Sequence, residues 1–138
     1  MKIEKLENKE NLIKVMDQIF EENDREHNAE LGFRTFAYAL KNDSDEIVGG
    51  VYGWKAFSEI YVDELCISKE NRGSGYGKKL LEIVEKEVNE GDCANINLVT
   101  NSFQGAVGFY KKCGFEVEFI RKNTKDSKYD KYYMIKKL

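Results

Sequence analysis

The sequence contains no proline, one histidine and three cysteines. Without proline, the turns must be marked by glycines and by clusters of Asn and Asp. His27 has no second histidine at ligand spacing, and Cys66, Cys93 and Cys113 form no C-x-x-C pair. We therefore expect no disulfide framework and no metal site.

Long hydrophobic runs are missing as well. No segment approaches the ~18 apolar residues of a membrane span, and residues 1–6 alternate polar and apolar instead of forming the apolar centre of a signal peptide. A cytoplasmic protein without membrane association is expected. The net charge of -3 forces no basic face, which argues against general nucleic-acid binding. With 138 residues, 41% of them hydrophobic, the composition is typical of one globular domain over residues 1–138.

Hydrophobic periodicity predicts a mixed α/β fold. Apolar residues after Glu10, among them Leu12, Val15 and Ile19, recur at the three- and four-residue spacing of an amphipathic helix. Early hairpins and later βαβ crossings indicate a mixed, mostly antiparallel sheet of about seven strands with helices on both faces. Strands are predicted over 2–6, 33–40, 47–54, 58–67, 95–100, 115–120 and 131–138, and helices over 10–20, 80–88 and 103–113, with 21–32 open between a loop and a short helix.

The segment after the strand at 58–67 has glycine at three alternate positions, Gly73, Gly75 and Gly77. Glycine lets a ligand approach the backbone closely and makes positive φ angles cheap. Where such a loop opens a helix, unpaired N–H groups and the positive end of the helix dipole point at the ligand. The loop therefore predicts an anion site, most naturally for a pyrophosphate, with a merely flexible turn as the alternative.

Two common phosphate motifs do not fit this loop. A Walker loop would need glycine where Arg72 stands and Ser or Thr where Lys79 stands. A dinucleotide fingerprint would need glycine at Lys78 or Leu80. A nucleotide-phosphate site of another kind is therefore disfavoured.

Two segments together resemble the GNAT superfamily of acetyl-CoA-dependent N-acetyltransferases. The sequence RGSGYG at 72–77, preceded by LCI at 65–67, resembles the coenzyme A loop of that family. The sequence FYKKCGF at 109–115 resembles its second signature, and the two are separated by a helix and a strand, as the family requires. The resemblance covers 47–115 well and the first strand and helix only in layout. It implies the family fold and acetyl-CoA as co-substrate, with no metal.

The resemblance also implies roles for individual residues. The pantetheine arm would pair with the strand before the loop, where two parallel strands, 58–67 and 95–100, separate to admit it, and the loop amides would take the pyrophosphate. Many family members carry Asn where this chain has Phe103, which leaves Asn101 or Gln104 to make that contact. The predicted cofactor-binding residues are Leu65, Cys66, Ile67, Arg72, Gly73, Ser74, Gly75, Tyr76, Gly77, Lys78, Asn101, Phe103, Phe109 and Lys112.

Tyr110 matches the tyrosine that the family is thought to use as general acid toward the departing thiolate. A phenol of ordinary pKa ~10 stays neutral at pH 7 and can donate to a thiolate whose conjugate acid has a pKa near ~8.5. The alternative is that Phe109 and Tyr110 form an aromatic pair that packs a helix onto the sheet.

Asp63 and Glu64 are the candidates for the base that deprotonates an amine substrate. Adjacent strand residues point to opposite faces, so at most one of them faces the acceptor. Family members with a carboxylate at the Asp63 position use it near the amine, which favours Asp63. Glu59 shares its face unless a β-bulge intervenes.

The resemblance thus implies an N-acetyltransferase that moves the acetyl group of acetyl-CoA to a primary amine by direct attack in a ternary complex. The acceptor would be a small-molecule or peptide amine, selected by 21–32 and 54–59, and the sequence leaves its identity open. A homodimer is compatible with this function. The alternative is a catalytically silent acyl-CoA sensor of the same fold, which would need neither Tyr110 nor the carboxylates near Asp63.

Overall fold

The computed structural model describes residues 1–138, which divide into two compact units, Met1–Leu31 and Gly32–Leu138. The first unit contains helix α1, Glu10–Glu26. The predicted helix over 10–20 is thereby confirmed, and the open segment continues it to Glu26. Residues 2–6 form no strand, because no other strand pairs with them to accept their backbone hydrogen bonds. The sheet consequently has six strands instead of about seven.

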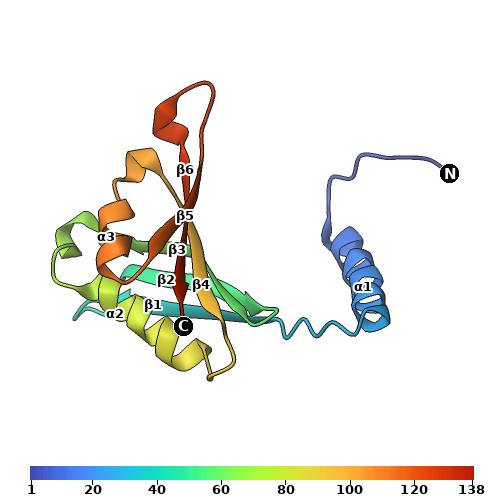
Figure 1. Ribbon diagram of the computed structural model, residues 1–138, viewed down its shortest axis with the longest axis horizontal. Helices are drawn as coiled ribbons and strands as arrows, with labels where there is room; N and C mark the ends of the chain where they lie inside the picture. The colour runs from blue at the N-terminus through green and yellow to red at the C-terminus, as the bar shows by residue number, and fades with distance from the viewer. The chain divides into compact units, whose positions relative to one another are not determined.

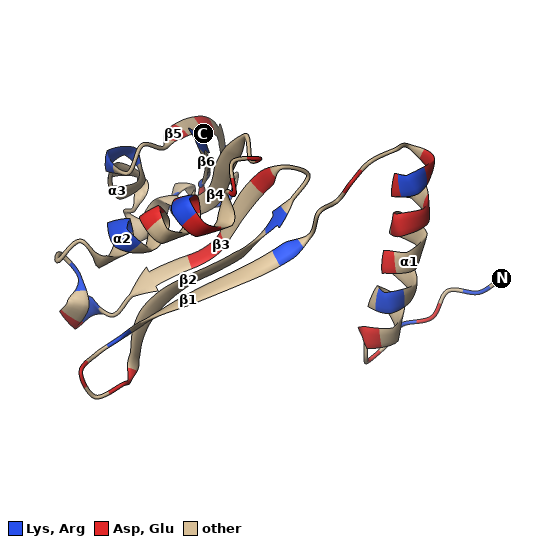
Figure 2. Cartoon of the chain, turned by 90° about the horizontal axis from the view of Figure 1, so that it is seen from below, with Lys and Arg blue, Asp and Glu red and all other residues tan.

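Helix α1 is amphipathic. Acidic and basic residues recur along it (Figure 2), and its apolar positions, such as Leu12 and Ile19, remain 43% and 60% exposed. No side chain of α1 is buried. Neither α1 nor any other helix is both long and apolar enough to cross a membrane.

The second unit is built on a six-stranded sheet with the order β1-β2-β3-β4-β6-β5 (Figure 1). Every neighbouring pair is antiparallel except β3 and β4, which are parallel. This confirms the predicted mixed, mostly antiparallel sheet. The strands are β1 Arg34–Lys41, β2 Ile47–Ala56, β3 Glu59–Ile67, β4 Asn95–Asn101, β5 Glu116–Arg121 and β6 Lys131–Lys137.

Helices α2, Tyr76–Ile83, and α3, Val107–Lys112, share one face of this sheet (Figure 1). A π-helical segment, Val84–Val88, extends α2. The core lies between these helices and the sheet, and its buried members are Val51, Ile60, Val62, Leu80, Leu81, Val84, Val88, Ile96, Leu98, Tyr110, Phe115 and Met134.

The predicted helix over 103–113 is divided in two. Ser102–Gln104 forms a 3₁₀ turn, and Gly105 follows with a φ of +63°. A residue in this left-handed conformation ends a helical turn, so α3 begins only at Val107.

A bulge in β3 and the separation of β3 from β4 shape the centre of the sheet. The two strands pair only over Glu59–Tyr61 and Asn95–Asn97 and then diverge. In the ladder between β2 and β3, Asp63 has no partner. Val62 and Leu65, three residues apart, therefore both face the core.

Candidate active site

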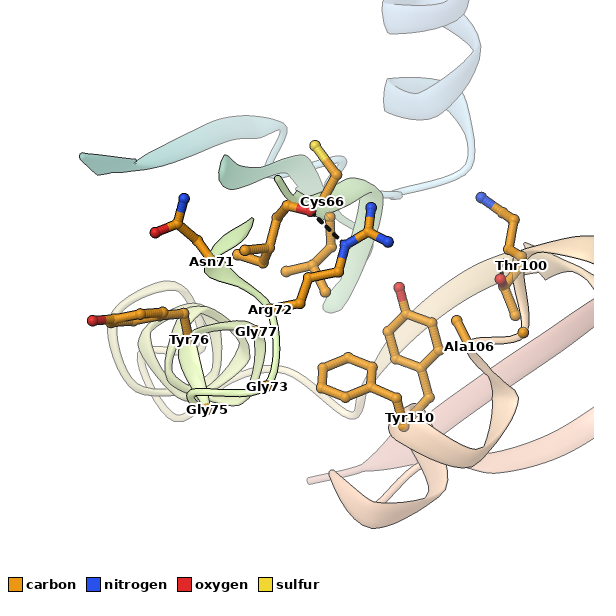
Figure 3. A pocket seen from close by; sticks show the side chains of 15 residues that line it. Cys66, Asn71, Arg72, Gly73, Gly75, Tyr76, Gly77, Thr100, Ala106 and Tyr110 are labelled. Carbon is orange, nitrogen blue, oxygen red and sulfur yellow. Dashed lines mark hydrogen bonds between the residues drawn. The ribbon is translucent and has the colours of Figure 1, made fainter. Parts of the chain in front are cut away.

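A cavity of about 620 Å³, here called the splay cavity, opens where β3 and β4 diverge (Figure 3). The end of β3, the glycine loop, the end of β4 and α3 supply its walls. Ten of the residues predicted from the sequence line it: Leu65, Cys66, Ile67, Arg72, Gly73, Gly75, Tyr76, Gly77, Phe109 and Tyr110.

Five predicted cofactor residues do not line this cavity: Ser74, Lys78, Asn101, Phe103 and Lys112. Lys78 and Lys112 border a smaller neighbouring hollow instead. Phe103 is 60% exposed and meets the ring of Tyr129 edge-on.

Gln104 reaches the splay cavity, whereas Asn101 does not. The Gln104 Oε1 accepts hydrogen bonds from the Asn101 backbone N–H at 2.7 Å and from the Thr100 hydroxyl at 3.1 Å. These bonds close a capping box that fixes the amide at the cavity wall. The sequence leaves the choice between Asn101 and Gln104 open. The Asn-x-x-Gln spacing, which is typical of a capping box, is the sequence feature that could have indicated Gln104. The lining residues that were not predicted from the sequence are Asn71, Thr100, Gly105 and Ala106.

The three glycines of the loop are needed for two different physical reasons. Gly73 and Gly75 have φ angles of +81° and +82°, and a Cβ on either would meet no atom within 4 Å. Their backbone is thus strained for other residues but open toward a ligand. Gly77 instead allows a close approach of two helices, because a Cβ there would lie 2.9 Å from the Cζ of Phe109.

Arg72 supplies the charge at this end of the splay cavity. Its Nε donates to the carbonyl of Ile67 at 2.8 Å, which ties the glycine loop to the end of β3 (Figure 3). It takes part in no ion pair. A guanidinium held this way keeps donors for a phosphate or similar anion.

Tyr110 is buried between Phe109 and Phe115, with ring centroids at 5.1 and 5.8 Å. Its hydroxyl points into the splay cavity (Figure 3). Desolvation, with a smaller contribution from Cys113, raises the pKa of Tyr110 to about 12. The phenol is therefore neutral at physiological pH and keeps its proton.

The expectation that Asp63 and Glu64 point to opposite faces is wrong, because the bulge between Val62 and Leu65 leaves both exposed, off the core face. The two candidate bases nevertheless lie in different surroundings. Asp63 lines a second cavity of about 500 Å³ on the sheet face away from α2 and α3, here called the far-face hollow. Glu64 lies beside Tyr52, whose pKa is raised by desolvation and by that carboxylate. Glu59 also lines the far-face hollow, so the bulge leaves Glu59 and Asp63 facing the same hollow.

The splay cavity and the far-face hollow differ in charge. Arg72 is the charged residue of the first, whereas the second is lined by Glu59, Asp63 and Glu118 and by no Lys, Arg or His. No three His, Cys, Asp or Glu side chains gather as metal ligands would.

Comparison with known proteins identifies the family. A model of the acetyltransferase (GNAT) family matches residues 2–115. The chain belongs to the GNAT acetyltransferase family. It is 29% identical over 82 residues to acetyltransferase Atu2258 of Agrobacterium fabrum, and this alignment spans 59% of each protein. The resemblance of its two sequence segments to GNAT proteins is thereby confirmed.

Solved structures share the fold. A crystal structure described as an acetyltransferase from Agrobacterium tumefaciens has a TM-score of 0.83 at 20% identity, over 100% of this chain and 98% of that one. A GNAT acetyltransferase from Elizabethkingia anophelis, solved with acetyl-CoA bound, has a TM-score of 0.64 at 19% identity, over 91% and 82% of the two chains. At these identities, the likeness concerns the GNAT fold.

Proposed function

We propose that this GNAT protein is an N-acetyltransferase that transfers the acetyl group of acetyl-CoA to a primary amine. The splay cavity carries the proposal, because it joins an open glycine loop and Arg72 at one end to the buried Tyr110 at the other. Family membership and the acetyl-CoA in the Elizabethkingia structure support the choice of co-substrate. The acceptor would be a small-molecule or peptide amine.

The residues of the splay cavity fit the parts of acetyl-CoA. The amides of the glycine loop and the Arg72 guanidinium would bind the pyrophosphate. Beyond Tyr61, β3 pairs with β2 but not with β4. Backbone groups of Leu65–Ile67 on the β4 side are therefore available to pair with the pantetheine arm.

In the proposed reaction the amine nitrogen attacks the thioester carbonyl carbon, a C–N bond forms, and the C–S bond breaks. Asp63, directly or through water, would relay a proton of the incoming ammonium, whose pKa is ordinarily near ~10, to solvent. The nitrogen would lose its second proton to water after the C–N bond has formed. The electron pair of the broken bond stays on the thiolate sulfur.

Tyr110 would act on that sulfur as a hydrogen-bond donor. Complete proton transfer from a phenol with a pKa of about 12 to a thiolate whose conjugate acid ordinarily has a pKa of ~8.5 is about 5 kcal/mol uphill. A hydrogen bond that strengthens as charge develops stabilises the transition state without that cost. The general-acid role expected from the family is thus refined to hydrogen-bond donation by Tyr110. The thiolate would receive its proton from solvent.

Release of free thiol from acetyl-CoA, screened over a panel of amines, tests this proposal. An enzyme releases many equivalents of thiol per protein molecule with at least one amine. A sensor of the same fold would bind acetyl-CoA in a one-to-one ratio and release none. Three further expectations remain predictions: a cytoplasmic location, a homodimer, and the lack of nucleic-acid and membrane partners. Light scattering after gel filtration tests the homodimer.

A further inference from the structure

The far-face hollow adjoins the splay cavity along the same two strands. Leu65 and Thr100 line the splay cavity, while Asp63 and Val99 line the far-face hollow. Only Glu64 lies between the two linings on β3, and the lining residues Val99 and Thr100 are adjacent on β4. A ligand held near Asp63 therefore lies where the strands diverge, next to the cavity that is proposed to hold acetyl-CoA.

The chemistry of the far-face hollow favours a cation. None of its three carboxylates, Glu59, Asp63 and Glu118, takes part in an ion pair. The rings of Trp54 and Tyr61, which also line it, stack at a centroid distance of 5.7 Å. Aromatic faces beside carboxylates attract ammonium groups by cation–π and charge interactions.

Glu59 is held in place for such a contact. The Tyr61 hydroxyl donates to its Oε2 at 2.5 Å, and the Asn95 side-chain amide donates to its Oε1 at 3.1 Å. Each carboxylate oxygen can accept a further hydrogen bond. The carboxylate is thus oriented by neutral donors while its charge remains uncompensated.

Glu59 and Asp63 are too far apart along β3 to share one ammonium group. Four residues of strand span about 13 Å. The hollow, at about 500 Å³, falls within the usual size of small-molecule sites. We propose that it binds the acceptor and selects a diamine or polyamine, with the reacting nitrogen near Asp63 and a second ammonium at Glu59. This inference rests on the proposed acetyl transfer.

A matched pair of amines tests the selection. We would measure kcat/KM for thiol release with 1,8-diaminooctane and with 1-aminooctane, which differ by one ammonium group. We expect the diamine to be preferred by roughly tenfold or more, as for one charge-assisted contact. In Glu59→Gln, which keeps an oxygen acceptor for Tyr61, the preference should fall toward one. Asp43→Asn, in the exposed turn between β1 and β2, is the control and should keep the wild-type preference.

The outcomes separate the two proposals. If both amines react with equal kcat/KM, or if the preference survives in Glu59→Gln, this inference is wrong and the acetyltransferase proposal stands. If neither these amines nor the wider panel release thiol, both are wrong. A loss of activity toward both amines alike in Glu59→Gln, with the preference kept, would mark Glu59 as structural and would also overturn the inference.

Discussion

Tyr110 is the residue on which the proposed chemistry depends most directly. In Tyr110→Phe we expect kcat to fall by about 10²-fold, as for loss of one hydrogen-bond donor to a developing charge. The donor to the thiolate is lost, while the ring that packs on Phe109 and Phe115 is kept. The affinity for acetyl-CoA should change little, since the contact matters in the transition state. Steady-state kinetics and calorimetric titration measure both. A wild-type kcat would make Tyr110 a packing residue.

The raised pKa of Tyr110 also predicts how stability depends on alkaline pH. The folded protein holds this proton up to a pKa of about 12, whereas an unfolded tyrosine releases it near ~10. Stability is therefore unaffected below pH 10 and lost as the pH rises from 10 to 12, by on the order of 2 to 3 kcal/mol. Urea unfolding over this range should show a smaller loss in Tyr110→Phe than in the wild type. Equal losses would contradict the raised pKa.

Gly75 tests the phosphate loop at the same scale. In Gly75→Val, a β-branched residue at a φ of +82° should cost about 1–2 kcal/mol in stability and block the approach of phosphate to the loop, so that acetyl-CoA binding is lost. Gly91→Val is the matched control, because Gly91 has a φ of +81° and equally open surroundings but lies outside the splay cavity. It should lose similar stability and keep binding. Retained binding in folded Gly75→Val would contradict the loop assignment.

At the scale of elements, the contact of α2 with α3 should depend on Gly77. The Cβ of Gly77→Ala would lie 2.9 Å from Phe109 Cζ, and such overpacking typically costs about 1–3 kcal/mol. Trimming the ring in Phe109→Leu should recover part of this loss in the double variant. Chemical denaturation of the four proteins measures the coupling. Strictly additive effects would show that the two residues do not meet.

Element prediction from the sequence succeeded where periodicity is strong. The helix beginning at Glu10 follows from its apolar spacing, and the hairpin strands follow from aromatic-rich segments on either side of the polar turn at 41–46. It failed at residues 2–6, which alternate as a strand does but lack a partner strand elsewhere in the chain. It also failed at Gly105, whose left-handed conformation ends the turn at Ser102–Gln104 before α3 begins.

The site was predicted in the same uneven way. The glycine loop and the Leu65–Ile67 segment were identified from short motifs, and they line one cavity. Part of the far-face hollow was also predicted, because Asp63, Glu59 and Trp54 of the segment 54–59 line it. Its other walls come from β4, β5 and β6, distant parts of the chain that no short motif connects. The sequence is compatible with a bulge in this strand, but only the strand register places it at Asp63.

For the whole molecule, a single acetyltransferase domain over residues 1–138 remains a prediction. The sheet of the second unit, its parallel β3–β4 pair and the family match account for the fold between Gly32 and Leu138. The family match names no acceptor, so the choice of acceptor rests on the proposal for the far-face hollow.

Ligand-dependent thermal unfolding of the full chain tests most directly whether the splay cavity is an acetyl-CoA site. Acetyl-CoA at about 100 times its dissociation constant should add about 2.7 kcal/mol to stability. ATP and NAD at the same concentration should add much less, and Gly75→Val should respond to none of the three. A melting temperature that rises equally with all three ligands, or that does not rise with acetyl-CoA, would contradict the assignment of this cavity.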